Sequence, residues 1–253
     1  MLAIFKREFK SYFQNVIGWL FVAALLAVYG LYFYVYNLKN GYPYISYDLK
    51  GIGFIMMIAV PILTMRSLSD EKKTKTDQLM LTSPVSVGRI VAGKYLAMAA
   101  VYTIDIALFA LSPLVLSIYG KVALSEAYVA LFGYWLYGLS CIAVGLFISS
   151  ISESVIISAI LTFAALFLSY MMQSITGLIS SSGNLLTKVL NCFDLYTPFE
   201  NFVSGCFSVT SVFYYVMFIL LLCFLTTQFV HKRRCSFSKM MIGTGVFSAG
   251  MFV

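Results

Sequence analysis

The segment Pro61–Ala97, PILTMRSLSDEKKTKTDQLMLTSPVSVGRIVAGKYLA, decides the fold because it is the one long polar interruption in an otherwise apolar chain. It leaves an apolar stretch at Met65, carries six charged side chains within Asp70–Asp77, and becomes apolar again at Val91. A polar segment between two long apolar stretches indicates a loop in water that joins two membrane helices. We therefore expect residues 67–89 to form a loop on one side of a membrane.

Within this loop, residues 76–81 (TDQLML) are expected to form a short helix. Thr76 is a suitable N-cap, Asp77 would lie near the positive start of the helix, and Pro84 would force its end. A short amphipathic helix parallel to the membrane would suit docking of a soluble partner, whereas the alternative is a solvated charged turn. The candidate docking residues of this loop are Asp70, Glu71, Thr76, Asp77, Gln78, Leu79, Met80 and Leu81.

The composition indicates an integral membrane protein. Of the 253 residues, 61% are hydrophobic and 11% are charged, whereas soluble domains have about 45–50% and about 25%. Six apolar stretches lie near the roughly 20 residues that cross a bilayer core. They are Val16–Tyr36, Gly51–Ser67, Ile90–Tyr119, Ala127–Ser150, Val155–Ile179 and Val212–Val230.

Each span must be helical because lipid offers no partner to an unpaired backbone group. The chain is therefore predicted to be an all-α membrane protein with six transmembrane helices, and residues 1–253 form a single domain. The third stretch is longer than a span requires, so either its start lies in the interface or Pro113 marks a bend.

Residues 1–15, MLAIFKREFKSYFQN, place apolar side chains at helical spacing with charged ones between them. This pattern predicts an interfacial helix with its apolar side toward lipid and its basic side toward phosphates. A plain basic flank of the first span is the alternative, and the segment lacks the features of a signal peptide. Its candidate interface residues are Lys6, Arg7, Glu8, Phe9, Tyr12 and Phe13.

The basic residues are distributed unevenly between the two sides. Three precede the first span, six flank the second connection and four follow the sixth span, so one side has 13 of the 17. Because positive residues remain in the cytoplasm, both termini and the polar loop are predicted to be cytoplasmic. The net charge of +7 then reflects topology and anionic lipid, and it gives no reason to invoke nucleic acid.

Two outer connections remain on the opposite side. Asn37–Lys50 is short and rich in tyrosine, which is typical of an interfacial aromatic belt. Residues 180–211 are too polar to span and rich in Phe and Leu, so one or two short interfacial or re-entrant helices are expected there. Cys192 and Cys206 lie in this segment, either as a disulfide or as apolar packing residues.

Residues 240–253 form an apolar tail too short to cross the membrane. The tail either lies in the interface or begins a further span.

The connection Ser149–Ser154 is so short that the fourth and fifth spans must form an antiparallel hairpin. Glu153 would lie at the cytoplasmic surface, either near the start of the fifth helix, capped by Ser152, or in contact with a partner. Three glycines of the fourth span are expected to permit close helix packing: Gly133, Gly138 and Gly145.

Asp105 is the exceptional charge within the apolar spans, which makes it a candidate for the transport pathway. The alternative is an aspartate that holds neighbouring helices together, with Thr103 or Ser112 nearby. The five scattered cysteines and the single His231 do not predict a metal site, and no nucleotide-binding or hydrolase motif occurs. We therefore expect no enzyme activity and no cofactor bound by this chain.

Several motifs in chain order resemble one family of membrane proteins. The opening Phe5–Phe13 with Ile17–Trp19, and the central Pro61–Arg66, resemble ABC-2 permeases, the type-2 transporter permeases, and especially the gliding-motility and copper-maturation branch. Further similar segments are Asp70–Lys73, Leu79–Ser86, Gly93–Ala97, Gly145–Ser150 with Glu153, and Phe199–Gly205. Departures from the pattern fall at Lys75, Asp77 and Gln78.

This resemblance implies an N-terminal elbow helix, six spans and a cytoplasmic coupling helix. It also implies a pair of permeases, identical or homologous, worked by two ABC ATP-binding subunits that hold ATP and magnesium, with a possible auxiliary membrane subunit. The implied function is that of a permease subunit of an ATP-driven exporter in the cell membrane, with unidentified cargo. The alternatives are a membrane anchor or assembly subunit that transports nothing, and an ion-coupled carrier that uses Asp105.

Overall fold

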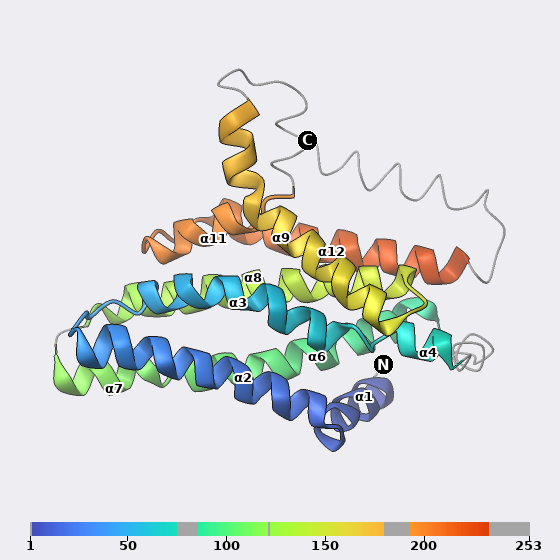
Figure 1. Cartoon of the computed structure of the whole chain (residues 1–253), viewed down its shortest axis with the longest axis horizontal. Coiled ribbons are helices and arrows are strands. Elements are labelled where there is room, and N and C mark those ends of the chain that lie inside the picture. The colour runs from blue at the N-terminus through green and yellow to red at the C-terminus, as the bar shows by residue number, and fades with distance from the viewer. Residues whose placement is uncertain (1, 75–85, 121, 180–192, 233–253) are drawn as a thin grey trace.

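The computed structural model describes residues 2–74, 86–120, 122–179 and 193–232. Every regular element in these ranges is a helix (Figure 1). The elements are α1 (Leu2–Gln14), α2 (Val16–Phe33), the π-helix η1 (Tyr34–Lys39), α3 (Ser46–Thr64), α4 (Ser69–Lys73), α6 (Val87–Phe109), α7 (Ser112–Tyr119), α8 (Leu124–Ile151), α9 (Val155–Ile179), α11 (Tyr196–Val203) and α12 (Val209–Lys232).

Six helical segments of the described chain are long and apolar enough to cross a membrane. This finding confirms the predicted all-α fold with six candidate spans, and each segment overlaps one of the predicted stretches. The six are Val16–Lys39, Ser46–Lys73, Val87–Tyr119, Leu124–Ile151, Val155–Met172 and Val209–His231.

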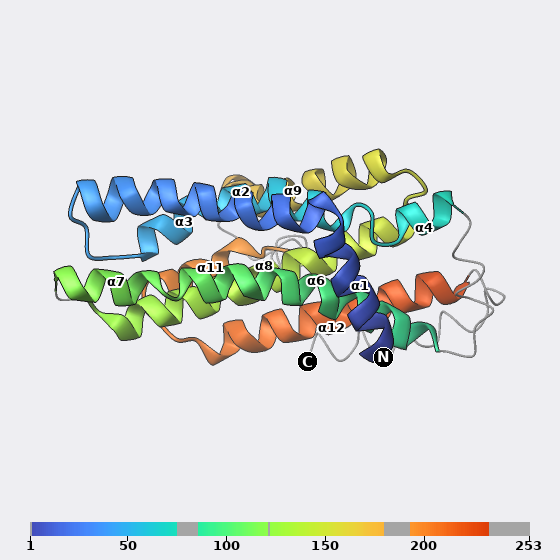
Figure 2. The ribbon, with the colours of Figure 1, turned by 90° about the horizontal axis from the view of Figure 1, so that it is seen from below.

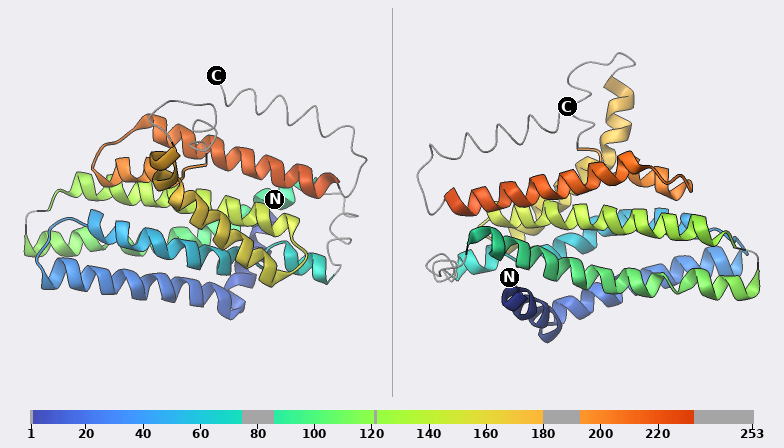
Figure 3. Two further views of the ribbon diagram at one scale, coloured as in Figure 1. Left: turned by 45° about the horizontal axis from the view of Figure 1, so that its top comes forward. Right: turned by 180° about the vertical axis from the view of Figure 1, so that it is seen from behind.

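Helix α8 is the centre of the bundle. It contacts α3, α6, α9, α11 and α12 (Figure 3), and most of its apolar stretch is buried, whereas most of the apolar stretch of α9 is exposed. Because α8 is apolar on all sides, helices can surround it. The peripheral helices leave large apolar side chains on the outside, as a bilayer requires.

The third span consists of two helices, in agreement with the predicted bend at Pro113. Helix α6 ends at Phe109, and α7 restarts at Ser112 with Pro113 in its first turn. Proline has no N–H to donate and is tolerated in a first turn, so it permits the restart. The Ser112 hydroxyl donates to the carbonyl of Phe109 at 2.7 Å and bonds the hydroxyl of Tyr29, which fixes the break.

The three glycines of α8 lie where other elements approach closely, as the sequence predicted. A Cβ atom added at Gly133 would lie 2.3 Å from Phe202, one at Gly138 would lie 2.3 Å from Tyr102, and one at Gly145 would lie 2.3 Å from Thr64. These distances are shorter than any van der Waals contact, so the absence of a side chain is what allows α3, α6 and α11 to approach α8.

We expect Gly138→Ala to lower stability by about 1–3 kcal/mol, the usual cost of overpacking a core. The ring of Tyr102 cannot move aside cheaply, because it is fully buried and its hydroxyl donates to the Tyr134 carbonyl at 2.7 Å. Gly30→Ala is the matched control, since an added Cβ at Gly30 meets no atom within 4 Å. Thermal unfolding of both variants in detergent checks the prediction, and equal midpoints would contradict it.

The two ends of the bundle differ. Helix α1, α4, the start of α6 and the end of α12 lie at one end, and α7, the start of α3 and α11 lie toward the other (Figure 1). Helix α1 crosses the long axis of the bundle steeply instead of following it (Figure 2). The described basic residues that the sequence assigns to one side therefore lie at one end of the molecule, here called the basic end.

The first connection at the opposite end is shorter than predicted. The sequence suggested a loop over Asn37–Lys50, but η1 continues to Lys39 and α3 begins at Ser46. The buried amide of Asn37 donates to the buried carboxylate of Asp48. This hydrogen bond joins η1 to the first turn of α3, and the Oδ1 atom of each side chain has no partner among the described residues.

The outer segment before α12 contains the short helix α11, as expected for residues 180–211, although residues 180–192 and Cys192 lie outside the described chain. Asp194 caps this helix by accepting bonds from the backbone N–H groups of Tyr196 and Thr197, both at 3.0 Å. Phe199 and Phe202 are fully buried. Helix α11 is therefore packed into the bundle through its aromatic side, which fixes this end.

Candidate functional site

The polar loop begins with α4, which is anchored to the end of α8 by a serine. The hydroxyl of Ser149 accepts hydrogen bonds from the backbone N–H groups of Leu68 at 3.1 Å and Ser69 at 3.2 Å. These N–H groups belong to the first turn of α4, where a helix leaves its donors without internal partners. A buried serine of α8 thus takes the place of a local N-cap and fixes where the loop starts.

Lys72 makes the second connection between α4 and α8. Its ammonium group donates to the carbonyl of Ser150 and, at 3.3 Å, to the carbonyl of Ser152. These carbonyls form the C-terminal end of α8, where the helix dipole favours a positive charge. The same ammonium lies 5.7 Å from the centre of the Phe229 ring on α12, which adds a cation–π contact.

Lys94 of α6 is the most buried cation in the described chain, with 2% of its side chain exposed. Its ammonium donates to Glu71 at 2.6 Å, to the carbonyl of Ser67 at 3.0 Å and to Glu8 at 3.3 Å. A buried ammonium requires such partners, because an unpaired charge in the interior is costly. This Lys94 cluster, made of Glu8, Ser67, Glu71 and Lys94, joins α1, the start of the polar loop and α6.

Aromatic side chains follow one another along α1 and meet the first turn of α2. Ring centroids are 5.8 Å apart for Phe5 and Phe9, 5.0 Å for Phe9 and Phe13, and 5.4 Å for Phe13 and Trp19. The indole N–H of Trp19 donates to the carbonyl of Phe13 at 2.9 Å. Burial raises the pKa of Tyr12, and the negative charge of Glu8 raises it further. The contacts of Phe13 with Trp19 therefore stabilise the turn between α1 and α2.

The predicted docking residues fall into two groups. Asp70 and Glu71 lie on α4, where Glu71 belongs to the Lys94 cluster, and Glu153 is exposed in the turn between α8 and α9. Residues 76–81 lie outside the described chain.

The predicted interface residues lie on α1. Lys6, Arg7 and Lys10 are exposed, whereas Phe9, Tyr12 and Phe13 pack against the core.

The turn between α8 and α9 differs in one respect from the prediction. Ser152 was expected to cap the start of the fifth helix, but it is the C-cap residue of α8, and its hydroxyl donates to the Ser154 carbonyl at 2.9 Å. The turn is so short that the hydroxyl meets a carbonyl before it can reach the first N–H groups of α9. The predicted hairpin itself is confirmed, because only residues 152–154 separate the two helices.

Sequence reasoning missed Ser149, Lys72 and Lys94 as contact residues. All three lie within segments that resemble the family, but no side-chain contact was predicted for any of them. A useful signal was available, because a lysine at the eighth position of a long apolar helix needs a carboxylate partner.

Asp105 lies near the C-terminal end of α6 and is fully buried. Neither carboxyl oxygen has a hydrogen-bond partner among the described residues. The suggested partners are wrong: Thr103 donates to the carbonyl of Ala99 at 2.7 Å, and Ser112 bonds Tyr29 and Phe109. Thr103 is two residues from Asp105 and so faces another side of the helix. Among the described residues, no group of three potential ligands could hold a metal ion.

If ATP drives transport, as the family resemblance implies, Asp105→Asn should keep transport near the wild-type rate, because no proton gradient would supply the drive. Asp105→Leu should unfold no earlier than the wild type, since it removes a buried carboxyl without a partner, a group that costs about 1–3 kcal/mol. Transport and ATPase rates in vesicles, with unfolding in detergent, check both variants. Loss of transport in Asp105→Asn with ATPase and expression intact would place the carboxyl in the transport path.

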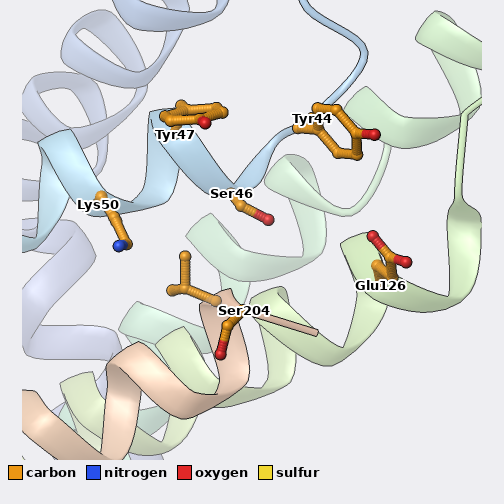
Figure 4. A pocket seen from close by; sticks show the side chains of 7 residues that line it. Tyr44, Ser46, Tyr47, Lys50, Glu126 and Ser204 are labelled. Atoms are coloured by element: carbon orange, nitrogen blue, oxygen red, sulfur yellow. The ribbon is translucent and has the colours of Figure 1, made fainter. Parts of the chain in front are cut away.

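A polar pocket of about 290 Å³ opens at the end opposite the basic end. Its labelled side chains come from the start of α3, the start of α8 and the end of α11 (Figure 4). Lys50 lines it and forms an ion pair with Glu200 at 3.7 Å, while the exposed Glu126 lies across from it (Figure 4). The described chain thus has charged groups at both ends and apolar surface between them.

These features define a class: a multi-pass integral membrane protein whose basic end holds the start of a polar loop against several membrane helices. The family described as ABC-2 family transporter protein matches residues 26–227. The chain therefore belongs to the ABC-2 transporter family, whose permeases associate with an ABC ATP-binding subunit. No curated protein matches the chain.

Proposed function

We propose that this chain is the permease subunit of an ATP-driven exporter and works with two ABC ATP-binding subunits and a second permease, either an identical copy or a homologue. The observation that carries this proposal is the Lys94 cluster. A loop that served only to connect two spans would not need its start to be ion-paired with a buried lysine of α6. A loop that receives force from a partner needs firm attachment to the helices it must move.

The attachment supports a mechanical role for the start of the loop. Ser149 and Lys72 bind α4 to α8, and Lys94 binds it to α6 and α1. ATP and magnesium would bind to the partner subunits, which close when ATP binds. Closure would press on residues 67–89, and the contacts of α4 would pass the displacement to α1, α6 and α8 as a rigid-body movement.

The gliding-motility and copper-maturation branch remains part of the proposal, because the motifs that resemble it extend along the chain. The rival proposal is a membrane anchor or assembly subunit, which predicts a stable complex with the ATPase but no movement of cargo. An ion-coupled carrier that uses Asp105 is the third proposal. It predicts transport that persists without ATP and collapses with the ion gradient.

The experiment that tests the proposed function is reconstitution of the chain with its ATP-binding subunit in vesicles. We expect ATPase activity that rises when a transported compound is present, together with ATP-dependent movement of that compound. Candidate compounds can be drawn from peptides, lipids, glycans and antibiotics. A complex whose ATPase responds to none of them and moves none would support the anchor proposal.

Orientation has its own test. We propose that the basic end faces the cytoplasm, so an impermeant thiol reagent added to intact cells should label Asn40→Cys but neither Lys73→Cys nor Ser238→Cys. Lysed cells should label all three, which controls for accessibility. Labelling of Lys73→Cys in intact cells would reverse the proposed orientation.

A further inference from the structure

An apolar groove of about 780 Å³ lies on the outside of the bundle between α1, α6 and α8. Leu2 and Phe5 form its wall on α1, Tyr95 to Ala107 its wall on α6, and Trp135 and Leu139 its wall on α8. Its volume is within the range of sites that hold small molecules.

The polar atoms in this lining are satisfied within the protein. The indole N–H of Trp135 donates to the Thr103 hydroxyl at 3.1 Å, and that hydroxyl donates to the carbonyl of Ala99 at 2.7 Å. The hydroxyl of Tyr95 donates to the carbonyl of Leu139 at 3.2 Å. Because these groups need no water, the groove offers a surface suited to a hydrocarbon chain.

The length of the groove along α6 matches the thickness of one leaflet. Helix α1 crosses α6 at Gly93, where an added Cβ would lie 3.0 Å from Ile4, and the groove starts next to this crossing at Tyr95. From Tyr95 to Ala107 an α-helix rises about 18 Å, close to half of the roughly 30 Å hydrocarbon core. A chain in the groove would thus begin at α1 and end near the bilayer centre.

We propose that the groove holds an acyl chain of an anionic phospholipid whose headgroup binds α1. Lys6 and Lys10 are exposed on α1, one turn apart, and Arg7 between them is also exposed and pairs with Glu8 at 2.7 Å. Basic residues on an amphipathic interfacial helix attract anionic headgroups. With the basic end in the cytoplasm, as proposed above, this lipid would belong to the inner leaflet. The lipid site itself does not depend on whether the chain transports cargo.

The test uses Trp135, because the chain has only one other tryptophan, Trp19. A Trp19→Phe chain keeps an aromatic ring beside Phe13 and leaves Trp135 as the single indole. It is reconstituted into phosphatidylcholine vesicles with a small fraction of lipid brominated on its acyl chains, either phosphatidylglycerol or phosphatidylcholine. We expect brominated phosphatidylglycerol to quench Trp135 more strongly, with an apparent affinity about fivefold higher for each lysine involved.

Two variants in the Trp19→Phe background separate the contribution of the lipid headgroup from that of the acyl chain. Lys6→Gln with Lys10→Gln should make the two brominated lipids equal, because the headgroup contact is lost. Ala100→Phe with Ala107→Phe should reduce quenching by both, because the added rings fill the groove, whereas the exposed Ala24→Phe on α2 should change neither. Equal quenching by both lipids in the parent chain would overturn the proposal, and quenching by neither would mean that protein, such as a second copy, covers the groove.

Discussion

Lys94→Met is expected to lower the free energy of unfolding by about 3–5 kcal/mol, the range for breaking a buried ion pair by removing one partner. Lys94 is 2% exposed, and its two carboxylate partners are 15% exposed at Glu8 and 20% at Glu71. Without the ammonium, both carboxylates would remain in a poorly hydrated site near each other. Thermal unfolding of the purified chain in detergent, followed by helicity, measures the loss.

Two further variants show whether the charge is responsible. Lys94→Met combined with Glu8→Gln and Glu71→Gln should recover part of the loss, because neutral amides are cheaper to bury than carboxylates. Lys73→Met is the matched control, since Lys73 is an exposed lysine on α4, two residues from Glu71. If Lys94→Met unfolded at the same temperature as Lys73→Met, the cluster would not stabilise the fold.

The sequence predicts the membrane helices well because their signals are local. An apolar stretch of sufficient length must be helical in lipid, Pro113 marks the break in the third span, and the glycines of α8 mark close approaches. The polar contacts were less predictable, because Lys94 meets Glu8 across 86 residues and Lys72 meets Ser150 across 78. Such pairings depend on how the helices are arranged, which no local pattern contains.

The surroundings of Asp105 were also not predictable from the sequence. Its place within a membrane span was predictable from its apolar neighbours, and so was its cost there. Which side chains surround it depends on the helical face, and both suggested partners are engaged elsewhere. The residue type thus identified an unusual position, whereas the contacts of that position could be found only from the structure.

Helix α4 links these stability arguments to function. It has five residues, far fewer than the roughly 12–15 that an isolated helix needs in water. Its conformation must therefore come from Ser149, Lys72 and the Lys94 cluster, which attach it to the membrane helices. A displacement of the residues that follow α4 would then reach α6 and α8 directly, as the proposed coupling requires.

The second large effect is expected at residues 76–81, the proposed docking helix. Burial of a Leu side chain contributes about 1.5–3 kcal/mol, whereas an exposed ion pair contributes at most about 1 kcal/mol. The apolar residues should therefore anchor the ATP-binding subunit. Leu79 and Leu81 are two positions apart and cannot share one face of a helix. We expect one of Leu79→Asp and Leu81→Asp to weaken the complex about 10–200-fold and the other to change it little.

Co-purification of the ATP-binding subunit in detergent and the ATPase rate of the complex measure this difference. The damaging variant should lose the subunit, or keep hydrolysis without transport, while its unfolding midpoint stays at the wild-type value because the membrane helices are untouched. Lys94→Met gives the complementary result, since it should lower the midpoint while leaving the docking residues in place. Wild-type co-purification and ATPase rates for Leu79→Asp, Leu81→Asp and the double variant would mean that this loop only connects two spans, and the force would have to enter through α1 or the Glu153 turn instead.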